Sequence, residues 1–74
     1  MERQTFVNQM KARGYETTLP SPTGNVTATK GDIAVRLIPL ADYIVYIDTP
    51  IVSAIIRKDA TDAEMMNIIA ALTD

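Results

Sequence analysis

The chain has 74 residues, which is the size of one small domain and leaves no room for a second. Its 47% hydrophobic and 22% charged residues are typical of globular proteins and argue against disorder, and its net charge of −2 argues against a polyanion as the main ligand. Because Cys and His are both absent, neither a disulfide nor a structural zinc site stabilises the fold, and the remaining common means of support is a partner chain.

The first predicted element is a helix over residues 2–13. Its apolar residues repeat at the spacing of one helical face: Phe6, Val7 and Met10. Gly14 is suited to the left-handed conformation that follows a helix C-cap, and Tyr15 would then fold back on Met10 in a Schellman motif.

Residues 16–25 contain two prolines and a glycine and predict an irregular loop, with a short strand over 17–19 as the regular alternative. Two β-rich runs follow, over 26–29 and 33–38. We expect them to form a tight hairpin with a bulge, in which Gly31 supplies the positive φ angle.

Residues 43–48 are all strand formers up to the final aspartate and predict a strand. Residues 51–58 are ambiguous. They fit a strand that returns through a turn at Thr49 and Pro50, and they also fit a helix with Thr49 as its cap and Pro50 at its first position. The strand is favoured because β-branched residues crowd the segment.

The last element is a helix over residues 61–73. Thr61 and Glu64 have the spacing of a capping box, in which each side chain bonds the other residue's amide. One apolar stripe follows at helical spacing: Met65, Ile68, Ile69 and Leu72.

The order of elements is therefore helix, two hairpins, helix. It predicts a single α+β domain over residues 1–74, a two-layer sandwich with a four-stranded antiparallel sheet and both helices on one sheet face. No charged N-terminal region precedes an apolar run, and prolines and aspartates interrupt the most apolar stretch, so we expect a soluble, cytoplasmic chain with no membrane segment.

The residue types that are missing argue against catalysis. Without His there is no imidazole base, and without Cys there is no thiolate nucleophile. Pairing of Ser53 with Lys58 is the one catalytic alternative, but Ser53 is better explained as a small packing residue in a strand. We expect a protein that is not an enzyme and needs no cofactor.

Three acidic residues gather near the last helix and raise the question of a metal site: Asp59, Asp62 and Glu64. The segment lacks the glycine and the alternating carboxylates of a calcium loop. Negative charges in the first turn of a helix are favourable in themselves, so we assign this cluster to the helix start and expect no metal.

Cations near the first helix suggest nucleic-acid binding as an alternative function. Arg3, Lys11 and Arg13 cluster there, with Tyr15 beside them. A phosphate-binding surface needs a dense basic face, whereas this chain has nine acidic residues, so nucleic acid is not the expected partner.

The sheet is the feature that calls for a partner. In residues 43–47 and 51–56 both strand faces are apolar or aromatic, although a sheet with one wet face should alternate. Two short helices cannot cover both faces. A second copy of the chain is the simplest cover and predicts a homodimer, unless residues 51–56 form a third helix that covers the sheet.

We therefore expect a protein-interaction module, in the form of a small inhibitor or regulator of the kind that phages and mobile elements encode, which binds an unidentified partner protein. A nucleic-acid-binding regulator and a small-molecule-binding protein with a pocket between helices and sheet are the alternatives. The loop over 20–25 is a candidate contact because its prolines lower the ordering cost of binding. The candidate contact residues are Pro20, Pro22, Asn25, Arg36, Tyr43, Ile44 and Tyr46.

Overall fold

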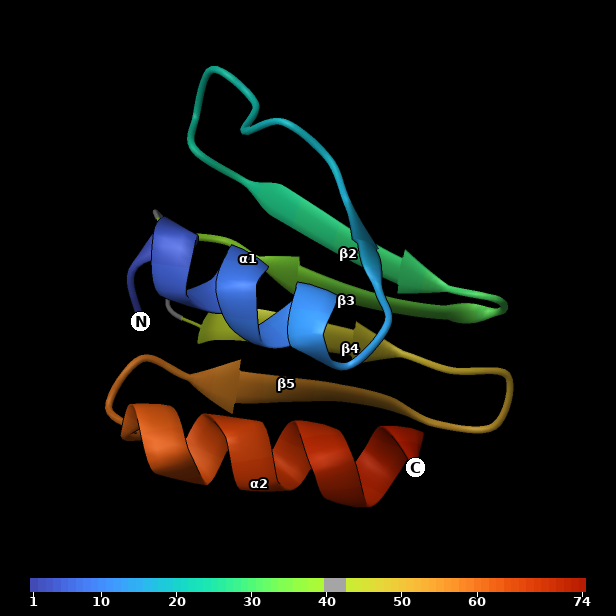
Figure 1. Cartoon of the computed structure of the whole chain (residues 1–74). Helices are drawn as coiled ribbons and strands as arrows, with labels where there is room; N and C mark the ends of the chain where they lie inside the picture. The colour runs from blue at the N-terminus through green and yellow to red at the C-terminus, as the bar shows by residue number, and fades with distance from the viewer. Residues whose placement is uncertain (40–42) are drawn as a thin grey trace.

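The computed structural model describes residues 1–39 and 43–74, apart from the side chain of Tyr43. Helix α1 (Arg3–Ala12) precedes the strands and helix α2 (Asp62–Thr73) follows them. The strands are β1 (Glu16–Thr17), β2 (Val26–Lys30), β3 (Ile33–Leu37), β4 (Tyr43–Asp48) and β5 (Ser53–Arg57). They form one antiparallel sheet whose strand order follows the chain (Figure 1).

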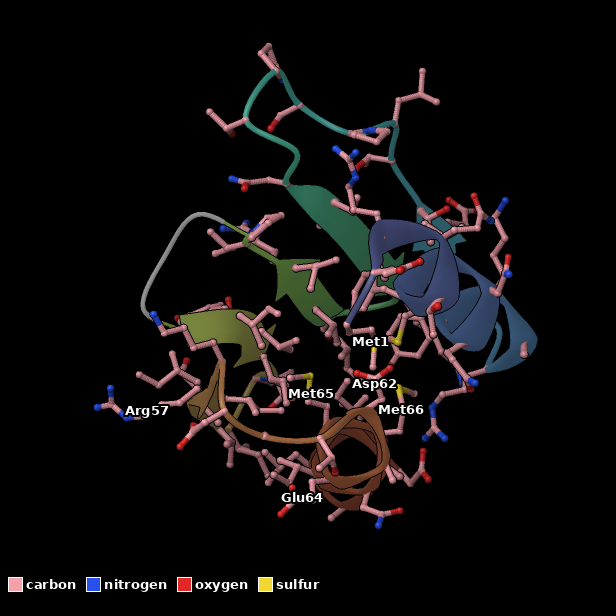
Figure 2. All side chains as sticks on the ribbon, turned by 90° about the vertical axis from the view of Figure 1, so that its left-hand side faces the viewer. Met1, Arg57, Asp62, Glu64, Met65 and Met66 are labelled. Carbon is pink, nitrogen blue, oxygen red and sulfur yellow. The ribbon has the colours of Figure 1, made fainter. Side chains whose placement is uncertain are left out.

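Both helices lie on the same face of the sheet, as the two perpendicular views show (Figures 1 and 2). The core lies between these two layers. Alternate residues of the central strands face the helices, which bury them completely, whereas their neighbours face the other way. The buried residues are Phe6, Met10, Tyr15, Val26, Ala28, Val35, Leu37, Val45, Ile47, Ile56, Met65 and Ile69.

The α+β architecture with its terminal helices is confirmed, but the predicted number of four strands is wrong. The fifth strand is β1, in which Glu16 pairs with Thr29 and Thr17 pairs with Ala28. The Thr18 amide continues this ladder by donating to the Thr27 carbonyl at 2.9 Å. The short strand considered over residues 17–19 overlaps β1, but these pairings join residues about a dozen positions apart, so the local pattern could not place the strand in the sheet.

Both hairpins form, and the first is tighter than predicted. Lys30 pairs directly with Ile33, so the loop has only two residues and no bulge. Gly31, the first of the two, has a φ of +58°, whereas Asp32 does not have a positive φ, which is the pattern of a type II′ turn.

The ambiguous segment after Pro50 forms strand β5, so the preference for a strand is confirmed. Thr49 makes the turn: its amide donates to the Val52 carbonyl at 2.8 Å, and its hydroxyl accepts from the Val52 amide at 2.9 Å. The chain then reverses, and Ile55 pairs with Tyr46 of β4.

The helix ends follow the predicted signals. At the end of α1, the Tyr15 amide donates to the Met10 carbonyl and the Gly14 amide donates to the Lys11 carbonyl, both at 3.0 Å, and Gly14 has a φ of +89°. This is the Schellman motif. At the start of α2, the Glu64 amide donates to the Thr61 hydroxyl at 3.1 Å, and the Thr61 amide donates to the Glu64 carboxylate at 2.9 Å.

Among the described residues, neither helix is long and apolar enough to cross a membrane.

Candidate functional site

The sheet face that points away from the helices is the first candidate surface, and we call it the outer face. The strand register places one residue from each of four neighbouring strands in a row across it: Thr27, Arg36, Tyr46 and Ile55. A second row runs beside the first: Thr29, Ala34, Asp48 and Ser53. Neither helix covers these rows, because both helices pack on the opposite face (Figure 1).

The outer face combines apolar and charged side chains. Ile55 keeps 49% of its surface exposed, and Tyr46 beside it is half-buried. Arg36 and Asp48 provide opposite charges on neighbouring strands, and Arg57 extends from β5 away from the helices (Figure 2). An apolar centre with charges of both signs around it is the usual composition of a protein–protein interface.

Two of the predicted contact residues on β4 have a different setting. The ladder between β4 and β5 is irregular between Tyr43 and Val45, which interrupts the alternation of side chains there. Ile44 is half-buried and packs against the core cluster. The side chain of Tyr43 lies outside the described residues.

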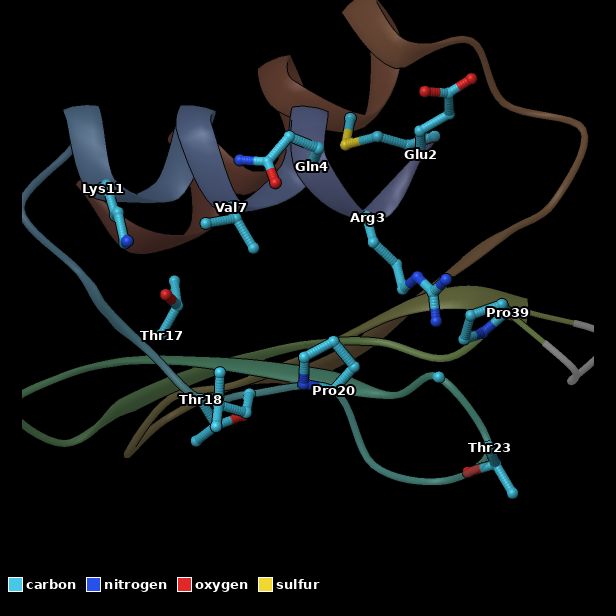
Figure 3. Close-up of a pocket in the computed structure, with 13 residues that line it drawn as sticks. Glu2, Arg3, Gln4, Val7, Lys11, Thr17, Thr18, Pro20, Thr23 and Pro39 are labelled. Carbon is cyan, nitrogen blue, oxygen red and sulfur yellow. The ribbon is translucent and has the colours of Figure 1, made fainter.

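The second candidate surface is a groove of about 970 Å³ between α1 and the segment that leads from β1 to β2. Arg3, Val7 and Lys11 lie four positions apart on α1, so they share one helical face and form one wall. Their side chains point toward the opposite wall, as Figure 3 shows. Met1, Glu2 and Gln4 complete the lining at the start of α1, and the opposite wall and the end of the groove contain Thr17, Thr18, Leu19, Pro20, Thr23, Gly24 and Pro39.

Hydrogen bonds hold the loop side of this groove in place. The Gly24 amide donates to the Ser21 carbonyl at 2.8 Å, and the Ser21 amide donates to the Asn25 carbonyl at 2.9 Å. The Asn25 amide also donates to the Ser21 hydroxyl at 3.1 Å. Pro22 lies exposed at the second position of the turn, where its fixed φ angle suits the backbone. Of the contact residues predicted in this loop, Pro20 lines the groove, whereas Pro22 and Asn25 do not.

A close contact between α1 and the loop defines the end of the groove. A Cβ atom at Gly24 would lie 3.0 Å from the Arg3 Nη1 atom and 3.6 Å from the Pro39 side chain. A side chain at position 24 would displace the Arg3 guanidinium from the loop backbone, and the φ of +88° at Gly24 also disfavours any residue with a side chain.

The basic cluster that suggested nucleic acid is divided in the structure. Arg3 and Lys11 line the groove and are exposed. Arg13 is instead bound to the Asp74 carboxylate at 2.7 Å. Lys30 lies over the ring of Tyr15, 5.6 Å from its centre, and its ammonium donates to the Arg13 carbonyl.

The serine and two of the three carboxylates that were considered for chemistry have structural partners, and the third, Asp59, is exposed in the turn before α2. The Ser53 hydroxyl donates to the Asp48 carboxylate at 3.2 Å. The Asp62 carboxylate lies 3.5 Å from the N-terminal ammonium of Met1 (Figure 2). The amide of Thr61, together with its side chain, lowers the pKa of the Glu64 carboxyl below its usual value. Within residues 1–39 and 43–74, no three acidic side chains gather as a metal-binding group.

Sequence reasoning missed the groove and Ile55. Val7 was placed on one helical face with Phe6 and Met10, and it is half-buried at the groove wall, whereas those two are buried in the core. The spacing of Arg3, Val7 and Lys11 is a signal that the sequence does contain. Ile55 has no local signal, because only the register of β5 against β4 decides which face it takes.

No protein-family model, no curated protein and no solved structure matches the chain. What this protein does must therefore be argued from the two surfaces.

Proposed function

We propose that this protein is a non-enzymatic protein-interaction module that forms a homodimer through its outer face and acts as a small inhibitor or regulator by binding a partner protein. The observation that supports the dimer is the uncovered row of Thr27, Arg36, Tyr46 and Ile55. In a domain of this size, which has no Cys or His for a disulfide or zinc site, burial of this face adds stability that the single core cannot supply.

The charges of the outer face suit self-association. A symmetric dimer uses the same patch on both subunits, so each residue must be complementary to some other residue of that patch. Arg36 and Asp48 lie on adjacent strands and in adjacent rows. In a face-to-face dimer the two-fold axis lies in the plane of the interface, and an axis that passes midway between Arg36 and Asp48 would bring Arg36 of each protomer opposite Asp48 of the other, while Ile55 and Tyr46 supply apolar contact area.

Two observations favour a binding module over the alternative functions. Arg13 is engaged by Asp74, which removes one of the three cations required for a phosphate-binding surface. The groove is open and mixed in character, with exposed threonines and cations along most of its length, whereas small-molecule sites are enclosed and mostly apolar.

Sedimentation equilibrium tests the dimer directly. We expect a species of twice the 8.1 kDa chain mass at micromolar concentration. The Ile55→Asp variant should remain folded but sediment as a monomer, because the dimer would have to bury a new charge on each protomer. Ile51→Asp is the matched control, since Ile51 is 90% exposed in the β4–β5 turn and its substitution should leave the dimer intact.

Ile47→Asp separates the outer face from the core. Ile47 is fully buried under the helices, so an unpaired charge there should abolish folding, which circular dichroism would detect.

A wild-type chain that sediments at 8.1 kDa up to about 100 μM would refute self-association. For comparison, a micromolar dissociation constant corresponds to a binding free energy of about 8 kcal/mol.

A further inference from the structure

We propose that the groove between α1 and the β1–β2 segment is the partner-binding site, and that it binds an extended segment of a partner protein carrying two acidic side chains four residues apart. This inference rests on the proposed function, in that it assumes a protein partner, and it adds where that partner binds and which chemistry it presents. None of the residues in the two rows of the outer face lines the groove.

The charge of the groove identifies the chemistry of the occupant. Among the described residues, the ion pairs of the chain are Met1 with Asp62 and Arg13 with Asp74, so the exposed cations Arg3 and Lys11 have no acidic partner there. The chain as a whole is acidic, with a net charge of −2, yet the charged side chains that line the groove are two cations, Arg3 and Lys11, and one carboxylate, Glu2. Carboxylates are the complementary groups, and the complementarity favours an acidic partner over a neutral one.

The spacing of the cations sets the spacing of the carboxylates. Arg3 and Lys11 are eight positions apart on α1, which is about 12 Å along the helix axis. An extended chain covers roughly this distance in four residues, and side chains four residues apart point to the same side. The side chain midway between them faces Val7, so a small apolar residue fits there.

The opposite wall is suited to the backbone of an extended segment. The hydroxyls of Thr17, Thr18 and Thr23 line this wall. The Thr18 hydroxyl accepts from the Thr27 amide at 3.1 Å and can still donate to a peptide carbonyl, and the Thr23 hydroxyl is bonded to the Ser21 hydroxyl at 2.9 Å. Pro20 and the 90% exposed Leu19 provide apolar surface. The hydrogen bonds of Ser21 hold this wall in one conformation before binding, which lowers the entropic cost of complex formation.

A displayed library of random twelve-residue peptides tests the proposal while the partner protein is still unidentified. The full-length protein is immobilised, and enriched peptides are sequenced and measured by fluorescence anisotropy. We expect enrichment of peptides with Asp or Glu at positions four apart. The Lys11→Glu variant should weaken a selected peptide about tenfold, because charge reversal replaces attraction by repulsion of similar size.

Charge exchange and a matched control make the test specific. A peptide in which one acidic residue is replaced by Lys should regain binding to Lys11→Glu and lose binding to the wild type. Lys58→Glu makes the same charge change at an exposed residue outside the groove and should alter the affinity less than twofold. Circular dichroism checks that each variant is folded.

The outcomes separate failure of the groove from failure of the proposed function. Peptides that bind equally well to Lys11→Glu, but not to Ile55→Asp, would move partner binding to the outer face and overturn only the groove assignment. No enrichment above background would overturn both. Binding of a single-stranded oligonucleotide at the same salt concentration, lost in Lys11→Glu, would assign the groove to nucleic acid instead and overturn the acidic segment.

Discussion

Thr61→Ala should destabilise the fold by about 1 kcal/mol, because it removes the hydroxyl that caps α2. In the structure this hydroxyl accepts from the Glu64 amide at 3.1 Å, and no other group replaces it at that amide. The capping box also fixes the residue at which α2 begins. This matters for packing, because Met65 and Ile69 in the first part of α2 are buried in the core.

The expected size of the effect is measurable in a chain this small. With a urea slope of about 1 kcal/mol per molar, a loss of about 1 kcal/mol lowers the unfolding midpoint by about 1 M. The same loss lowers the melting temperature by about 4–8 °C. Thr61→Ser is the matched control, because serine keeps the capping oxygen and should retain most of the stability.

The Glu64 carboxylate gives the capping box a pH dependence of known sign. Its pKa is lowered in the folded state from an ordinary value of 4.5, because the Thr61 amide donates to its charged form. The contribution is therefore fully present above pH 4.5 and is lost as the pH falls through the lowered pKa. Glu64→Gln should show a smaller loss of midpoint on acidification below this value than the wild type.

A urea midpoint that is the same in Thr61→Ala and wild type, with the same slope, would refute this reasoning. It would mean that the hydrogen bond from the Glu64 amide to the Thr61 hydroxyl does not contribute to the stability of the folded state in solution. A changed slope would instead indicate a change in the denatured ensemble or a loss of two-state unfolding.

Two further predictions concern the backbone at the end of α1 and the absence of a metal requirement. Gly14→Ala should lower the urea midpoint, because a φ of +89° costs a residue with a side chain about 1–2 kcal/mol, and an unchanged midpoint would contradict the Schellman geometry. EDTA, calcium and zinc should each leave the melting temperature unchanged, because Asp62 and Glu64 already have partners in the folded chain; a rise of several degrees with calcium would reopen the acidic cluster as a site.

The helix ends were predictable from the sequence because their causes are local. A capping box needs only Thr61 and Glu64, and a Schellman motif needs only a glycine followed by an apolar residue. Each signal lies within about six residues of the structure it produces. The helices were accordingly placed to within one or two residues at either end.

The turn at Thr49 shows why the next segment was ambiguous. Its hydroxyl accepts from the amide of Val52, three positions on, which is the same bond that an N-cap makes. A helix start and this hairpin turn therefore share a local signal. Pairing with β4 determines that the segment forms a strand: Tyr46 pairs with Ile55, and Ile47 pairs with Ala54. This pairing cannot be predicted from residues 49–52 alone.

The apolar character of the outer face was overestimated for two structural reasons. Ile51 lies in the turn before β5 instead of in the strand, and Ile44 lies at the irregularity of the β4–β5 ladder and packs against the core. The strict alternation on which the sequence argument depended fails at both places. What remains on the face is Tyr46 and Ile55 among polar neighbours, a smaller and more charged surface than expected.

The two proposed surfaces are compatible because they lie on opposite sides of the sheet. The groove is formed by α1 and the β1–β2 segment on the helix side, whereas Arg36, Tyr46 and Ile55 point away from the helices. A dimer joined through the outer face therefore leaves both grooves open, one on each side of the assembly. Some partners would carry two acidic segments that can reach both grooves of one dimer. Once the first segment of such a partner is bound, binding of the second is intramolecular, so the overall avidity rises without any new kind of contact. For a single peptide the two grooves are independent, so the monomeric Ile55→Asp variant should bind it with the affinity of the wild type.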